Sequence, residues 1–92
     1  MVFLASLGEK AQRRGFSLAQ ELRDGGVWAE LDYEGKSLKS QMRKADKMKS
    51  AYVIILGEEE LKKNRVILRN MATKDQEEIP LEEIVRRMKS NS

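Results

Sequence analysis

One six-residue run constrains this 92-residue chain more than any other stretch. Residues 51–56, AYVIIL, are hydrophobic at every position. A strand points successive side chains to opposite faces of its sheet, so a strand with no polar face must be covered on both sides. The run therefore predicts a central strand, in a fold with layers on both faces of a sheet.

The segments around this run predict strands that alternate with helices. Short hydrophobic stretches bounded by Gly or Pro are typical of strands, and apolar residues three or four positions apart are typical of helices. On these patterns we expect strands at 2–7, 27–31, 51–56, 66–69 and 77–79, and helices at 9–24, 38–49 and from Pro80 onward. Residues 58–64 are expected to form a polar connection with at most one helical turn.

This order determines the topology of the sheet. Right-handed crossovers through the first two helices make the first three strands parallel and place those helices on opposite faces. The connections after residues 56 and 69 are too short for a crossover, so the last two strands add antiparallel. We predict one domain over residues 1–92, a three-layer α/β fold whose mixed five-stranded sheet has the order 2-1-3-4-5.

Each helix has an apolar stripe that predicts which residues it buries. The stripes are Ala11, Gly15, Leu18, Ala19 and Leu22 in the first helix, Leu38, Met42, Ala45 and Met48 in the second, and Leu81, Ile84, Val85 and Met88 in the third. Gly15 is expected to let the first helix approach the sheet closely. Ser37 is the expected N-cap of the second helix, and Pro80 suits the first turn of the third.

Missing residue types narrow the possible chemistry. The chain has no Cys and no His, which excludes a disulfide framework, thiolate metal sites and the commonest general base. It also lacks a GxxxxGK or GxGxxG phosphate loop. We therefore expect no catalytic residue, cofactor or metal in this domain, since the adjacent carboxylates at 58–60 rarely point at one ion. Without a membrane-length hydrophobic run or a signal peptide, we expect a cytoplasmic protein that does not contact a membrane.

The positive charge of the chain is concentrated just before the central strand. Residues 36–50 hold six Lys or Arg and one Asp, whereas 1–35 holds four bases and six acids, and 51–92 holds eight of each. The net charge of +3 therefore arises in this segment, where Lys39, Arg43 and Lys47 recur every four residues on one helix face. Such a face can be solvated, can bind an acidic protein, or can neutralise nucleic-acid phosphates. On composition alone the solvated face is the favoured interpretation, and the other two are alternatives to it.

Two further residues could recognise bases if the partner is RNA. Glu60 is a hydrogen-bond acceptor and Arg69 is a fork of donors, and unstacked bases are recognised through their polar edges. We expect the two side chains to lie close together if the third and fourth strands pair. The alternative is that they form a salt bridge with each other.

Two stretches carry a family resemblance that extends from Gly8 to about Met88. They are GKSLKSQMR at 35–43 and ILGE at 55–58, each with the expected elements around it. Together they resemble the C-terminal anticodon-binding domain of bacterial histidyl-tRNA synthetases. Related domains end the class II synthetases for threonine, proline and glycine, but the SLKSQMR-type helix indicates the histidine branch.

The resemblance implies a mixed sheet with helices on both faces, and a function in binding the anticodon stem-loop of histidine tRNA. It also implies that the chain is a fragment of a histidine–tRNA ligase, cut at a domain boundary, without the N-terminal catalytic domain. That catalytic domain would use ATP and Mg to activate histidine, and the parent enzyme is expected to be a homodimer.

The resemblance further implies which residues contact the tRNA. In related threonine enzymes, the positions that align with Glu60 and Arg69 contact anticodon bases, and the turn at 35–37 aligns with another contact region. The expected anticodon-binding residues are Glu60, Arg69, Lys36, Ser37, Lys39, Gln41 and Arg43, and Lys47 is expected to contact the phosphate backbone.

Two other functions stay open beside tRNA binding. A synthetase-like paralogue that does not charge tRNA would use the same fold as a protein-interaction or regulatory module. A small-molecule sensor would bind its ligand where the winding of the sheet reverses, between Gly8 and Gly57. No pocket motif marks that place in the sequence.

Overall fold

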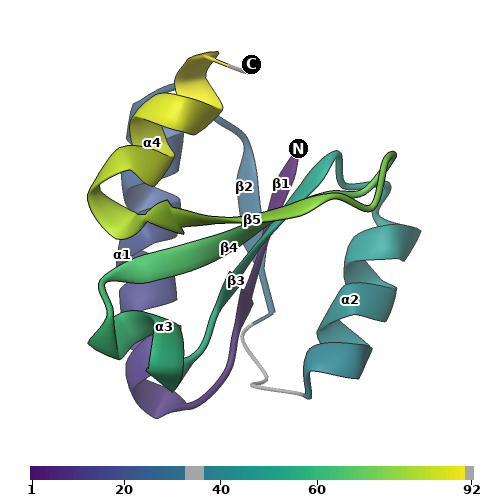
Figure 1. Cartoon of the computed structure of the whole chain (residues 1–92). Helices are drawn as coiled ribbons and strands as arrows, with labels where there is room; N and C mark the ends of the chain where they lie inside the picture. The colour runs from purple at the N-terminus through teal and green to yellow at the C-terminus, as the bar shows by residue number, and fades with distance from the viewer. Residues whose placement is uncertain (33–36, 91–92) are drawn as a thin grey trace.

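The computed structural model describes residues 1–32 and 37–90 of the chain. The strands are β1 (Val2–Ser6), β2 (Ala29–Leu31), β3 (Tyr52–Leu56), β4 (Arg65–Asn70) and β5 (Gln76–Pro80). The helices are α1 (Glu9–Asp24), α2 (Leu38–Lys47), α3 (Glu58–Lys62) and α4 (Leu81–Ser90). Figure 1 shows them as one sheet between two helical layers. Within the described ranges, every helix is too short or too polar to cross a membrane.

The sheet has the predicted order, β2-β1-β3-β4-β5. β1 is parallel to β2 and β3, and β4 and β5 add antiparallel. The central strand β3 buries the side chains of residues 53–56, which alternate between the two faces, as the hydrophobic run predicts. Pairing between β1 and β3 extends to Ser6 and Leu56, whereas pairing between β1 and β2 stops at Leu4 and Leu31.

The two faces of the sheet are covered unequally. α1, α3 and α4 pack on the face that carries Leu4, Ile54 and Val66, and they form the larger core. On the other face, α2 packs over β1 and covers a smaller cluster that includes Phe3 and Val53. Figure 1 shows α2 standing alone on its side of the sheet. The part of this face formed by β4 and β5 therefore has no helix over it among the described residues.

The close approach predicted at Gly15 is confirmed. A Cβ atom built on Gly15 would lie 2.2 Å from Oγ of Ser6 on β1, far inside van der Waals contact. The five residues of the predicted α1 stripe are the five that the helix buries. Absence of a side chain at Gly15 thus lets α1 lie directly on the sheet.

The predicted position of Pro80 is wrong. Pro80 is the last residue of β5, opposite Arg65 on β4, and α4 begins one residue later at Leu81. Because β5 is an edge strand, one of its sides needs no backbone donor, and a proline is tolerated there. Residues 58–64, predicted as a polar connection with at most one helical turn, contain the short helix α3.

The predicted buried stripe of α2 is only partly correct. Ala45 is buried, but Leu38 and Met48 are 36% and 38% exposed. Gln41, which a search for apolar residues passes over, is fully buried instead. The side of α2 that carries Gln41 therefore faces the sheet, because the carboxamide of Gln41 has buried hydrogen-bond partners there.

Candidate nucleic-acid interface

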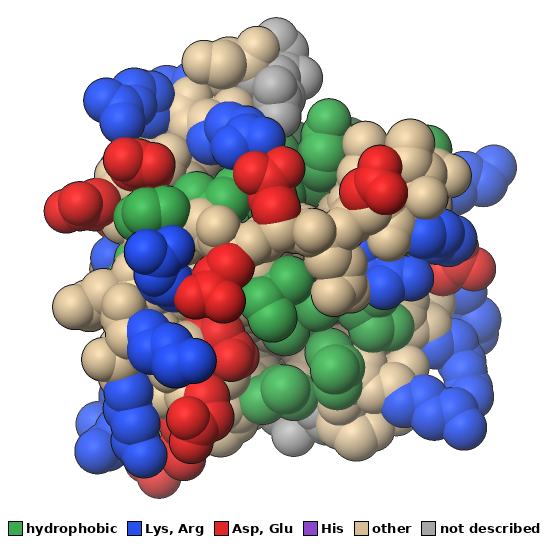
Figure 2. Space-filling model, viewed as in Figure 1, with side chains coloured by type: hydrophobic (Ala, Val, Ile, Leu, Met, Phe, Trp, Pro, Cys, Tyr) green, Lys and Arg blue, Asp and Glu red, His purple; other side chains and the backbone are tan. Residues whose placement is uncertain are grey.

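α2 presents the basic side chains predicted from the sequence. Its N-terminus is capped by Ser37, whose Oγ accepts the N–H of Ser40 at 3.3 Å. Lys39, Arg43 and Lys47 are exposed, and none of them has a carboxylate within 4.0 Å in the described part of the chain. Figure 2 shows Lys and Arg side chains along the right-hand side of the molecule, where α2 lies. This surface therefore carries positive charge that forms no ion pair with the described carboxylates.

The sheet beside α2 offers a second, different surface. Alternation along β4 directs Ile67 and its neighbours Arg65 and Arg69 to the face on which α2 packs, and their partners on β5 include Gln76 and Glu78. The half-buried hydrophobic side chains of this cluster are Met42, Ile67 and Met71. In Figure 2 a hydrophobic patch lies between the acidic side chains near β5 and the basic side chains near α2. We call the exposed face of α2 and this part of the sheet the α2–β4 surface.

Arg69 has hydrogen-bonding capacity that the fold leaves unused. Its Nη1 donates to Oε1 of Gln76 at 2.7 Å, while its buried Nε has no hydrogen-bond partner in the described structure. No carboxylate lies within 4.0 Å of the guanidinium group in the same ranges. Arg69 is half-buried and positively charged, so it can donate to an anion or a base edge.

Glu60 has a structural role that the sequence did not indicate. Its Oε1 accepts the N–H of Gly57 at 2.9 Å and caps the start of α3. The side chain is half-buried, and Oε2 has no such bond among the described residues. Glu60 can therefore accept from a ligand through Oε2 while it caps the helix through Oε1.

The prediction that Glu60 and Arg69 lie close together is wrong. β4 is antiparallel to β3, so Arg69 pairs with Val53 near the start of β3. Glu60 instead follows Gly57, beyond the other end of β3. Four residues of extended strand from Val53 to Gly57 correspond to roughly 13 Å at about 3.3 Å per residue. The two side chains therefore form no salt bridge, and they cannot bind the same base edge.

Gln41 does not belong to the exposed surface. Its Oε1 accepts the N–H of Ser6 at 3.1 Å, and its Nε2 donates to the carbonyl of Ser6 at 2.9 Å. The side chain is fully buried, so the predicted contact between Gln41 and tRNA does not agree with its position. The predicted contact at Lys36 lies outside the described residues.

Two charged residues near this surface were not singled out in the sequence. Arg65 lies on the open face, where its Nε is 3.4 Å from Oε1 of Glu78. Lys44 on α2 places Nζ 3.9 Å from Oδ1 of Asp32, a carboxylate that is only 3% exposed. Neither pair was predicted from the sequence, although each links parts of the chain that follow one another, β4 with β5 and the residue after β2 with α2.

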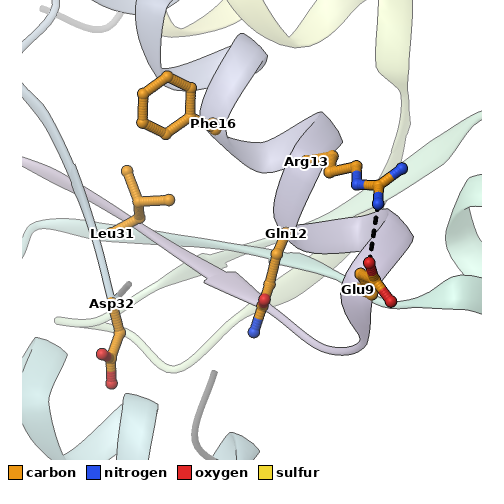
Figure 3. Close-up of a pocket in the computed structure, with 6 residues that line it drawn as sticks. All are labelled: Glu9, Gln12, Arg13, Phe16, Leu31 and Asp32. Carbon is orange, nitrogen blue, oxygen red and sulfur yellow. Dashed lines mark hydrogen bonds and ion pairs between the residues drawn. The ribbon is translucent and has the colours of Figure 1, made fainter. Parts of the chain in front are cut away.

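A separate hollow lies beside α1 and reaches Asp32, the carboxylate that pairs with Lys44 of α2. It has a volume of about 460 Å³ and is lined by Glu9, Gln12, Arg13, Phe16, Leu31 and Asp32. Figure 3 shows Phe16 and Leu31 on one side of it and the ion pair between Arg13 and Glu9 on the other. Phe16, which lies off the apolar stripe of α1, is 48% exposed here.

At the place where the sheet winding reverses, a side chain of α3 lies close to Gly8. A Cβ atom built on Gly8 would lie 2.9 Å from Oε1 of Glu58. No observation on the described residues adds support to a small-molecule site between Gly8 and Gly57.

Comparison with known proteins agrees with this geometry. The family model described as an anticodon binding domain matches residues 1–91. The chain belongs to the anticodon-binding domain family. This family is named for binding the anticodon, an RNA loop. In this member of it, a basic helix lies beside a partly open sheet.

The most similar relatives specify a branch of the family. The histidine–tRNA ligase of Desulfatibacillum aliphaticivorans is 46% identical over 95% of this chain, and that of Bacillus subtilis is 39% identical over 97%. The chain spans only 21% of the length of each. The crystal structure of apo S. aureus histidyl-tRNA synthetase superposes with a TM-score of 0.91 and 33% identity, covering 96% of this chain and 23% of that one. The resemblance to the histidine enzymes is therefore confirmed.

Proposed function

We propose that this anticodon-binding domain binds the anticodon stem-loop of histidine tRNA, as the tRNA-recognition part of a histidine–tRNA ligase. The observation that carries the proposal is the α2–β4 surface, where unneutralised cations border an open, partly hydrophobic sheet. The cations can neutralise a phosphate backbone. The hydrophobic part of the sheet can contact unstacked bases, whose edges are recognised by polar groups beside it.

Phosphate neutralisation is assigned to the exposed cations of α2. Lys39 and Arg43 lie one helical turn apart, and Lys47 lies one turn further on, so the row follows the helix axis. Ser37, the N-cap of the same helix, adds an exposed hydroxyl group next to this row. Contacts of this kind give affinity and register, and they release counterions, but they do not distinguish sequences.

Base recognition is assigned to Arg69 on the α2–β4 surface and to Glu60, which lies outside this surface on α3. Arg69 offers guanidinium donors beside the hydrophobic patch, and Glu60 offers one carboxylate oxygen beyond the end of β3. Because strand β3 separates them, each would contact a different nucleotide of the loop. Lys36 remains a predicted contact outside the described residues.

The remaining parts of the reaction belong to the rest of the proposed ligase. The catalytic domain of that enzyme would bind ATP with Mg and carry out aminoacylation, and this domain would supply no catalytic residue. Homodimer formation and a cytoplasmic location are likewise predictions for the complete enzyme.

Mapping the bound RNA on the protein tests the proposal. We expect the histidine anticodon stem-loop to shift backbone amide NMR signals of α2, β4 and the start of α3, and to leave the outer face of α4 unchanged. Shifts confined to α1 and α4 would contradict the assigned surface. An absence of shifts at millimolar RNA would favour the protein-interaction module, which uses the fold without binding tRNA.

A further inference from the structure

Among residues 1–32 and 37–90, the end of β1 has no strand neighbour on one side. The N–H of Val2 bonds to Trp28 next to β2, and the N–H of Leu7 bonds to Leu56 on β3. Since backbone groups of alternate residues point to alternate sides, those of Ser6 point toward β2. Pairing with β2 has already stopped at Leu4, two residues earlier.

The side chain of Gln41 takes the place of the missing strand. Ser6 is 2% exposed, so without a partner its N–H and carbonyl would be unsatisfied in the interior. The carboxamide of Gln41 supplies one acceptor and one donor, at 3.1 and 2.9 Å, across 35 residues of sequence. The backbone of a longer β2 would offer the same two kinds of group.

This pair of bonds fixes the rotation of α2 as well as its position. Lys39 and Arg43 each lie two residues from Gln41, which places them about 160° around the helix from it. The other contacts of α2 are modest: Ala45 is its one fully buried apolar residue in the described structure, and Met42 is half-buried. Lys44 adds a second polar link, to the buried carboxylate of Asp32.

We infer that Gln41 is a positioning residue for RNA binding, because it holds α2 on the end of β1 with its basic face outward. The inference rests on the proposed function and deepens it. Gln41 touches no RNA, and it acts through Lys39, Arg43 and Lys47. The presence of Gln41 in the SLKSQMR stretch is thereby explained by its hydrogen bonds to the backbone of Ser6, and not by a contact with a base.

The test compares Gln41→Met with a core variant of equal stability. Met has a similar length but can neither accept from nor donate to Ser6, so we expect faster hydrogen exchange of the Ser6 amide. We also expect about threefold to tenfold weaker binding of the histidine anticodon stem-loop, and a salt slope lower by about 0.9 for each phosphate that is no longer neutralised. Ile84→Val, on α4 at the opposite face, should match the decrease in melting temperature with unchanged binding and slope.

The outcomes separate the inference from the proposed function. If Gln41→Met exposes the Ser6 amide yet binds RNA like the wild type, Gln41 is structural only and the inference is overturned. If the wild-type chain itself does not bind the stem-loop, the proposed function fails, and the inference fails with it. Should Gln41→Met not fold, Gln41→Asn, which keeps the carboxamide but is one methylene too short, provides the same comparison.

Discussion

At the scale of single residues, Arg69 differs from Arg13, Arg14 and Arg87 in what surrounds its guanidinium group. Arg13, Arg14 and Arg87 each bond to a carboxylate at 3.1 Å or less. Arg69 bonds to a neutral amide, and its Nε has no partner among the described residues. A buried donor without a partner costs free energy, and a ligand that engages this guanidinium would recover part of that cost.

Arg69→Ala should therefore weaken binding selectively. We expect a loss of about 1–3 kcal/mol on the cognate histidine stem-loop and a smaller loss on a loop with a changed anticodon, the usual scale of a bidentate base contact. Isothermal titration with both RNAs measures the difference. Arg86→Ala removes the same charge from the exposed side of α4 and should change neither affinity. Equal losses on the two loops would show that Arg69 contacts only the backbone.

Gly15→Ala should destabilise the domain through a single contact. The added Cβ would overlap Oγ of Ser6, and overpacking of this kind costs about 1–3 kcal/mol in the free energy of unfolding. Urea denaturation measures it, with Ser17→Ala on the exposed side of the same helix as the control. Adding Ser6→Ala to Gly15→Ala should restore most of the stability, because that Oγ has no hydrogen bond among the described residues. Failure of the double variant to recover would place the strain elsewhere.

Residue-scale prediction from the sequence failed where polar side chains serve the backbone. Gln41 was expected at the RNA because it lies in the stretch that resembles the histidine enzymes, yet it completes the end of β1. Glu60 was expected to meet Arg69, yet it accepts the N–H of Gly57. Neither role follows from residue type or spacing, since both depend on where a strand stops.

At the scale of elements, the basic helix was predictable and its orientation was not. The recurrence of Lys39, Arg43 and Lys47 correctly indicated one exposed face of α2. The apolar stripe of the same helix was misjudged at Leu38 and Met48, because few apolar contacts hold α2 to the sheet and polar bonds contribute the rest. α1 and α4 have ordinary apolar stripes, and their buried residues were predicted well.

Lys47→Ala tests whether this helix face contacts phosphates. If it does, the plot of log affinity against log salt concentration should become shallower by about 0.9, and all stem-loops should be weakened alike. Lys10→Ala removes an exposed Lys from α1 on the other face, and the slope should stay unchanged. Fluorescence anisotropy between about 50 and 200 mM salt measures both. A slope unaltered by Lys47→Ala would mean that the basic face is simply solvated.

At the scale of the whole molecule, sheet order and layering followed from one hydrophobic strand and two crossovers. The order 2-1-3-4-5 was predictable because handedness and connection length leave few alternatives. The unequal coverage of the two faces was not predictable, because it depends on where α2 packs on the sheet. Because the two faces are covered unequally, the α2–β4 surface has cations on one side and a hydrophobic patch on the other (Figure 2).

The central claim is that this surface recognises an anticodon and not RNA charge alone. The most direct measurement is the affinity of the chain for the histidine anticodon stem-loop and for the same stem with a changed anticodon, at one fixed salt concentration. The account predicts at least about tenfold tighter binding of the histidine loop, a difference of about 1.4 kcal/mol. Equal affinities for the two loops would contradict it.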